Sequence, residues 1–195
     1  MFKKILLAAL LCAPLSALAQ KFGSYVHSDI MIAVPETKKA QEELNVLGQK
    51  YQTEITTMQK EYQAKLEAYQ KEVNEQTPAN IRERKEQEIM DLQQRIQQAQ
   101  QDNSAAFQKA QNEKIDPIVQ KVVKAVNDVA TEGGYVFIID EASASTAGMF
   151  LNAKFVEDVT NKVLAKLGIT PAQAAAAKAE AQKAAQAAAT AAQKK

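Results

Sequence analysis

The chain has 195 residues, 46% of them hydrophobic, and its 24 basic and 23 acidic residues give a formal net charge of +1. A balance so close to neutrality gives no general attraction for nucleic acid. With one cysteine and one histidine, the chain has no disulfide framework and little scope for a metal cluster built on histidine.

The first 19 residues have the pattern of a secretory signal peptide. Lys3 and Lys4 form a basic start, Ile5 to Ala13 an apolar core, and Ala17 to Ala19 a cleavage site. We predict cleavage after Ala19, which leaves a periplasmic chain without cysteine. Lipidation at Cys12 is disfavoured because the preceding Leu11 is not small. No later segment is long and apolar enough to cross a membrane.

Residues 20–34 are predicted to form a short strand and a short helix. The strand runs from Lys21 to Val26, where Phe22 and Tyr25 are typical strand formers. A short helix from Asp29 to Ala33 follows. Pro35 then begins a much longer helix, because proline is favoured in a first helical turn.

The long helix carries one narrow apolar stripe that repeats every eleven residues. Its members are Ala40, Leu44, Leu47, Tyr51, Ile55, Met58, Tyr62, Leu66, Tyr69 and Val73. Eleven residues in three turns is about 3.67 residues per turn, close to a straight α-helix. Nearly all other side chains are polar or small, so the pattern predicts an arm with one packing seam instead of a core helix.

A second helix is predicted to return beside the first. The tip lies near residues 74–80, where Thr77 and Pro78 have the character of an N-cap and a first helical position. The return helix is rich in glutamine, and its Ile96, Phe107 and Ile118 again stand eleven residues apart. Residues 35–116 are therefore predicted to be a coiled-coil hairpin, and Pro117 is expected to kink the return helix.

After Pro117 the composition becomes apolar, which predicts that residues 20–34 and 117–168 form a β-containing body. The expected elements are a helix ending at Gly133, strands at Tyr135 to Ile139 and Met149 to Leu151, and a helix from Phe155 to Leu167. Residues 169–195 are rich in Ala, Gln and Lys. We expect them to be a mobile, partly helical tail, because nothing large is there to dock.

A body of fewer than about 70 residues rarely forms a stable core alone, and short strands are marginal by themselves. We therefore predict that subunits share one core. The candidate interface residues are the apolar side chains of the expected strands: Phe22, Tyr25, Val136, Phe137, Ile138, Met149 and Leu151.

Six segments follow one another in a distinctive order: Lys21 to Ser28, Ile81 to Glu88, Asp91 to Gln97, Ile118 to Val122, Gly134 to Asp140, and Asp158 to Leu164. Together with the leader, this order resembles the Skp/OmpH-like family of periplasmic chaperones. The resemblance implies an α+β homotrimer in which strands of three chains form a shared barrel and each chain adds a coiled-coil tentacle. It implies an ATP-independent holdase that uses no cofactor and cages unfolded outer-membrane proteins.

The candidate client contacts lie along the arms: Tyr51, Ile55, Met58, Tyr62, Leu66, Tyr69, Ile96 and Phe107. The tyrosines have the spacing of the seam, so filling the seam is the favoured role, and both roles are compatible. Arg82, Arg84 and Lys85 are candidates for weak contact with a membrane surface. The interleaved Glu86 and Glu88 instead favour pairing within the helix.

No catalytic, cofactor or metal residue is expected. Asp140 and Glu141 follow a strand, but adjacent strand residues point to opposite faces, so a turn role is favoured over acid/base chemistry. His27 is expected to be a strand-end residue. A structural coiled-coil adaptor that binds a folded envelope protein is the alternative function, and an enzyme ranks third.

Overall fold

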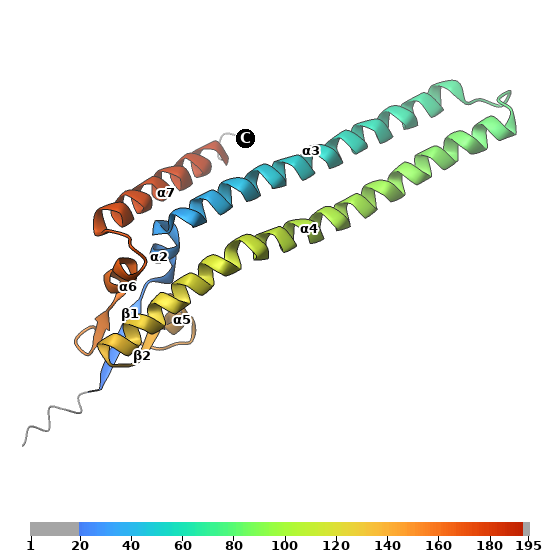
Figure 1. Ribbon diagram of the computed structural model, residues 1–195. Helices are drawn as coiled ribbons and strands as arrows, with labels where there is room; N and C mark the ends of the chain where they lie inside the picture. The colour runs from blue at the N-terminus through green and yellow to red at the C-terminus, as the bar shows by residue number, and fades with distance from the viewer. Residues whose placement is uncertain (1–19, 193–195) are drawn as a thin grey trace, which may run out of the picture. The chain divides into compact units, whose positions relative to one another are not determined.

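The computed structural model describes residues 20–192, and its elements form two compact units (Figure 1). One unit, the arm, consists of residues 35–120. The other, the body, consists of residues 20–34 and 121–192. The predicted signal peptide lies outside the described residues. No helix between residues 20 and 192 has the length and hydropathy needed to cross a membrane.

The arm is an antiparallel pair of helices, α3 (Pro35–Glu72) and α4 (Ala79–Gly133) (Figure 1). At the tip, the Thr77 hydroxyl accepts a hydrogen bond from the Asn74 amide at 2.9 Å. The Pro78 carbonyl then accepts from the Arg82 amide at 3.1 Å, the first helical bond of α4. The connection between the two helices is therefore residues 73–78, and α4 begins at Ala79.

Pro117 lies inside α4, which continues as one helix to Gly133. The boundary between the two units falls between Gln120 and Lys121, one turn beyond the proline. The change of composition that the sequence places at Pro117 thus corresponds to a change of unit within one unbroken helix.

The seam of the arm is dry only at some of its positions. Five large side chains of the arm are buried, each at most 9% exposed: Leu44, Ile55, Leu92, Ile96 and Ile118. Beside them, Glu43 pairs with Lys114, and Glu54 accepts from Asn103 at 3.2 Å. The two pairs are eleven residues apart on both helices, so the polar contacts repeat with the three-turn period of the seam.

The body contains a three-stranded parallel sheet in the order β2-β1-β3. The strands are β1 (Lys21–Tyr25), β2 (Tyr135–Asp140) and β3 (Val156–Asp158). Phe22 of the central strand pairs with Phe137 on one side and Val156 on the other. Because β1 is central, β2 and β3 each keep one edge without a strand partner among the described residues.

The predicted strand at Met149 to Leu151 is wrong, because that segment has no regular structure and the third strand is β3. Gly148 has a φ of +72°, and the Asn152 carbonyl accepts from the Phe155 amide at 2.9 Å. These turns hold 147–155 as a loop. Helix α6 (Thr160–Lys166) starts later than the predicted helix from Phe155, at the point where Asp158 Oδ1 accepts from the Thr160 amide at 2.9 Å.

The core of the body is formed by side chains from its helices and by the residue before α6. Four of these side chains are fully buried: Ile30 of α2 (His27–Ala33), Val122 of α4, Val163 of α6 and Val159. Asp140 ends β2 and caps α5 (Glu141–Thr146) by accepting from the Ser143 amide at 2.9 Å. The expected turn role is thus corrected: Asp140 is a helix N-cap, and Glu141 begins a short helix that the sequence analysis does not predict. Burial opposes the charge, but hydrogen bonds from Ser143 and His27 lower the pKa of Asp140 below its ordinary value.

The C-terminal segment differs from the expected tail. It forms helix α7 (Pro171–Ala192), which packs against α2. Lys178 Nζ lies 2.7 Å from Asp29 Oδ2, and Ile169, just before the helix, is 8% exposed. Small alanine side chains permit a close approach, so the lack of large residues does not prevent docking.

Candidate functional site

The sheet of the body exposes apolar side chains beside its free edge. On β2, Val136 is 58% exposed and Phe137 48%. The Phe137 ring packs on Phe22 with centroids 4.9 Å apart. Of the remaining predicted strand residues in the interface set, Tyr25 and Ile138 are half-buried. An exposed apolar edge strand favours pairing with another chain.

The loop before β3 adds a second group of exposed apolar residues. Met149 and Leu151 from the predicted interface set lie here, together with Phe150, which is 99% exposed, and Phe155, which is 67% exposed. The sequence prediction missed Phe150 and Phe155. Their signal was an aromatic residue at each end of a short loop, where neither a strand nor a helix would bury it.

A polar network links the two outer strands of the sheet to α6. Tyr135 OH donates to Glu157 Oε2 at 2.6 Å and accepts from Lys162 Nζ at 2.8 Å. Hydrogen bonds from Lys162 and Tyr135 lower the pKa of Glu157. Each member of the network has a partner, so it holds the sheet together and leaves no free reactive group.

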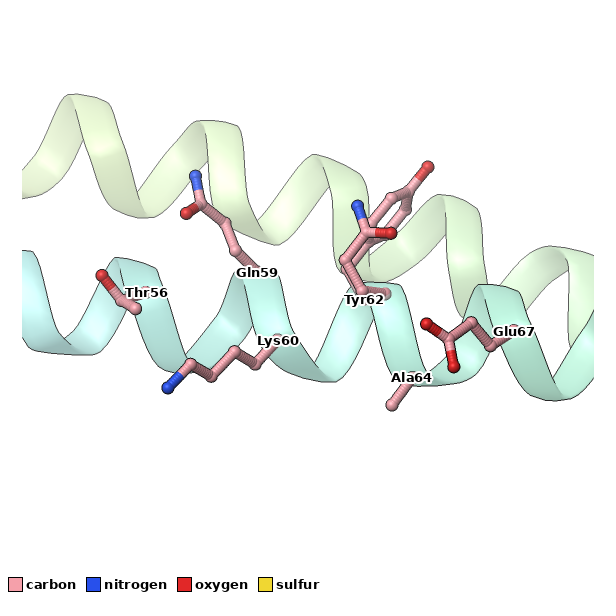
Figure 2. A pocket seen from close by; sticks show the side chains of 7 residues that line it. Thr56, Gln59, Lys60, Tyr62, Ala64 and Glu67 are labelled. Carbon is pink, nitrogen blue, oxygen red and sulfur yellow. The ribbon is translucent and has the colours of Figure 1, made fainter.

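The predicted client-contact residues all lie along the seam of the arm, but with different exposure. Ile55 and Ile96 are each 9% exposed, which leaves them little surface for any other molecule. The remaining six are only partly buried: Tyr51, Met58, Tyr62, Leu66, Tyr69 and Phe107. Figure 2 shows Gln59 and Tyr62 rising from α3 toward α4, whereas Lys60 and Ala64 point away from it. The seam therefore presents aromatic edges beside a narrow dry centre.

The basic residues near the tip are held by neighbouring groups within the arm. Lys85 pairs with Glu72 of α3, and Arg84 Nε lies 3.9 Å from Glu88 Oε1. Arg82 Nη2 donates to the Asn74 carbonyl at 3.3 Å. The Arg84–Glu88 pair is the i,i+4 contact that the interleaved charges predict. The Lys85–Glu72 pair joins the two helices, which sequence spacing alone does not indicate.

The described residues were compared with the requirements of a metal site and of an enclosed pocket. Between residues 20 and 192, no three His, Cys, Asp or Glu side chains are arranged to hold a metal ion. The hollows found on this part of the chain are shallow and lie along the arm, lined mostly by glutamine, threonine and seam residues.

The chain matches a family of known proteins. Residues 21–167 match the family described as "Outer membrane protein (OmpH-like)", which is well over half of the chain and includes the strands, the arm and α6. No curated protein matches the chain significantly. The family match confirms the resemblance that the order of segments indicates, and α7 lies beyond its end. The chain therefore belongs to the OmpH-like family, whose members are periplasmic chaperones for outer-membrane proteins and not enzymes.

Proposed function

We propose that the chain is an ATP-independent holdase that cages unfolded outer-membrane proteins between its arms in the periplasm. The observation that carries the proposal is the seam of the arm, where six large side chains stay partly exposed along two long helices. A surface of this kind offers many weak contacts and no enclosed pocket. Weak contacts at many points give a useful total affinity while each one stays labile.

The proposed assembly is a homotrimer whose strands form a shared barrel. Two observations support it: both outer strands have an edge free of any described strand, and Val136 and Phe137 are exposed on one of them. A second chain that pairs there removes backbone groups and apolar side chains from water together. In this arrangement the signal peptide is cleaved after Ala19, and neither ATP nor a cofactor takes part.

The release of clients follows from the same weak contacts. A client that folds into the outer membrane buries the apolar residues that the arms touched, so folding competes with binding. The partly exposed seam residues, from Tyr51 to Tyr69 on α3 and Phe107 on α4, are the proposed contacts. Ile55 and Ile96 support them from within the seam.

The test dilutes unfolded β-barrel proteins from urea and measures their aggregation by light scattering. We expect the chain without residues 1–19 to suppress aggregation of several unrelated barrels without ATP. A structural adaptor recognises one folded partner through a defined patch, so it has no such general effect. Suppression for none of the barrels would contradict the holdase proposal.

A further inference from the structure

The arm separates charged from uncharged polar residues on its two flanks. In α4, from Gln87 to Asn112, the charged residues are Glu88, Asp91, Arg95, Asp102 and Lys109. Their spacings are three, four, seven and seven, so they lie on one flank of the helix. In α3, the charged residues from Glu43 to Glu54 are Glu43, Lys50 and Glu54, spaced seven and four apart in the same manner. Nearer the tip, Lys60 and Glu67 line a hollow together with Gln59, so the separation in α3 ends there.

Two shallow hollows place these flanks on opposite sides of the seam. One hollow is lined by Glu54 and Met58 of α3 and by Arg95 and Asp102 of α4, with uncharged neighbours. The hollow on the other side has no charged residue, and Gln52 and Gln59 face Gln100 and Ser104 there. Over this middle part of the arm, the charged flanks of the two helices thus meet on one side, and the uncharged flanks meet on the other.

We call the uncharged side the amide face and define it by six exposed glutamines: Gln52, Gln59, Gln97, Gln100, Gln101 and Gln108. Of these, only Gln52 has a side-chain hydrogen bond among the described residues, to Thr56 at 3.4 Å. Outside the amide face, Gln98 donates to Asp102 at 2.9 Å and Gln87 to Asp91 at 2.6 Å. Five of the six amides of the amide face are therefore left to water or to another molecule.

The chemistry of the amide face fits one kind of partner. A glutamine side chain offers both a donor and an acceptor, as a peptide group does. The rings of Tyr51 and Phe107 line the same side and supply apolar contact. A segment without charges can lie there and keep its hydrogen bonds, whereas a charged segment would lose water without gaining a partner charge.

We propose that the amide face is the side of the arm that holds the client, and that it binds uncharged stretches of unfolded chain through backbone groups and aromatic rings. Transmembrane β-strands contain such stretches wherever the polar residues that alternate with the apolar ones are uncharged. This inference rests on the proposed holdase function and assigns that function to one face. The charged face then remains in water and keeps the arm soluble.

The first test adds charge to the amide face without changing net charge. Gln97→Glu with Gln101→Lys creates a favourable i,i+4 pair, so helicity is retained. The matched control, Arg95→Glu with Asp102→Lys, inverts charges on the opposite face, again at constant net charge. The measurement is the dissociation constant for a small transmembrane β-barrel protein diluted from urea, with circular dichroism to check that each variant folds.

We expect the amide-face variant to bind the unfolded barrel roughly tenfold more weakly, a change of about 1.4 kcal/mol, and the control to stay within about twofold of the parent. If both variants bind like the parent, or the control loses as much affinity, the assignment to the amide face is wrong. A parent protein that binds no unfolded barrel would instead overturn the proposed function itself.

A second test measures directly which side of the arm contacts the client. A photo-crosslinking residue replaces either Gln101 or its neighbour Asp102, which line hollows on opposite sides of the arm. We expect crosslinks to the unfolded barrel from position 101 and few from position 102. Equal crosslinking would contradict the proposal. So would crosslinks from position 101 to a second copy of this chain, because the face would then be an interface between arms.

Discussion

Phe137→Asp is expected to convert the oligomer into monomers. Phe137 lies on β2, 48% exposed, and packs on Phe22 at 4.9 Å between ring centroids. A carboxylate at a shared apolar edge would be buried without a partner, which costs roughly 3–5 kcal/mol. Sedimentation equilibrium at micromolar concentration should show a trimer with no folded monomer for the parent, and mainly monomer for the variant.

Two further variants make this result specific to the interface. Val136→Asp changes a side chain that is 58% exposed and points to the other face of β2, so it tests the edge without removing the Phe22 contact. Val46→Asp, at an apolar residue of the arm that is 67% exposed, should leave the mass unchanged. If both strand variants assemble as the parent does, β2 is not the subunit interface. A folded parent monomer would refute the shared core.

A shorter arm is expected to keep the oligomer and lose large clients. Removing Glu61 to Lys71 and Glu86 to Ile96 takes eleven residues from each helix, which is three full turns at the period of the seam. The deletion removes whole contacts, such as Lys65 with Glu88, and retains Glu43–Lys114 and Glu72–Lys85. The dissociation constant for a large unfolded barrel should rise about tenfold or more, since fewer contacts act together.

A nine-residue deletion is the matched control, because it shortens the arm by a similar length but does not keep the apolar stripes of the two helices facing each other. Removing Gln49 to Thr57 and Gln100 to Gln108 takes about two and a half turns from the middle of each helix. When the stripes nearer the body are paired, the stripes nearer the tip then face away from one another. This variant should lose helical content in the arm, whereas the eleven-residue variant should not. Circular dichroism separates the two. If the eleven-residue variant holds large clients as tightly as the parent, the binding site lies in the body.

The arm was predictable because its signal is long and periodic. The stripe from Ala40 to Val73 required a helix with one seam, and Pro35 and Pro78 placed its limits to within a residue or two. Contacts across the hairpin were less predictable. The Lys85–Glu72 pair depends on the antiparallel register, which only the folded tip fixes.

The body was less predictable because its elements are short. Met149 to Leu151 and Val156 to Asp158 are both brief apolar or mixed runs, and three residues carry no periodicity that separates strand from loop. Val156 to Asp158 becomes the strand because it pairs with the edge of β1, and the turns at Gly148 and Asn152 keep Met149 to Leu151 in a loop. The docking of α7 on α2 was not predicted from the sequence, because a helix made mostly of alanine has no stripe of large apolar residues that would mark a buried face.

The separation of charge along the arm was visible in the sequence but had no meaning until the two helices were paired. Glu54 and Asp102 are far apart in the chain, and the folded hairpin places them on one side of the seam. Spacing alone shows that each helix has a charged flank. It does not show that the two charged flanks meet.

The central claim is that the chain binds clients because they are unfolded. It is tested most directly by the dissociation constants for one β-barrel protein in two states, freshly diluted from urea and folded in detergent micelles. The account predicts binding of the unfolded state at least a hundredfold tighter, about 2.7 kcal/mol or more, with no ATP present. Equal affinity for the two states would contradict the claim, because recognition would then be of a folded partner.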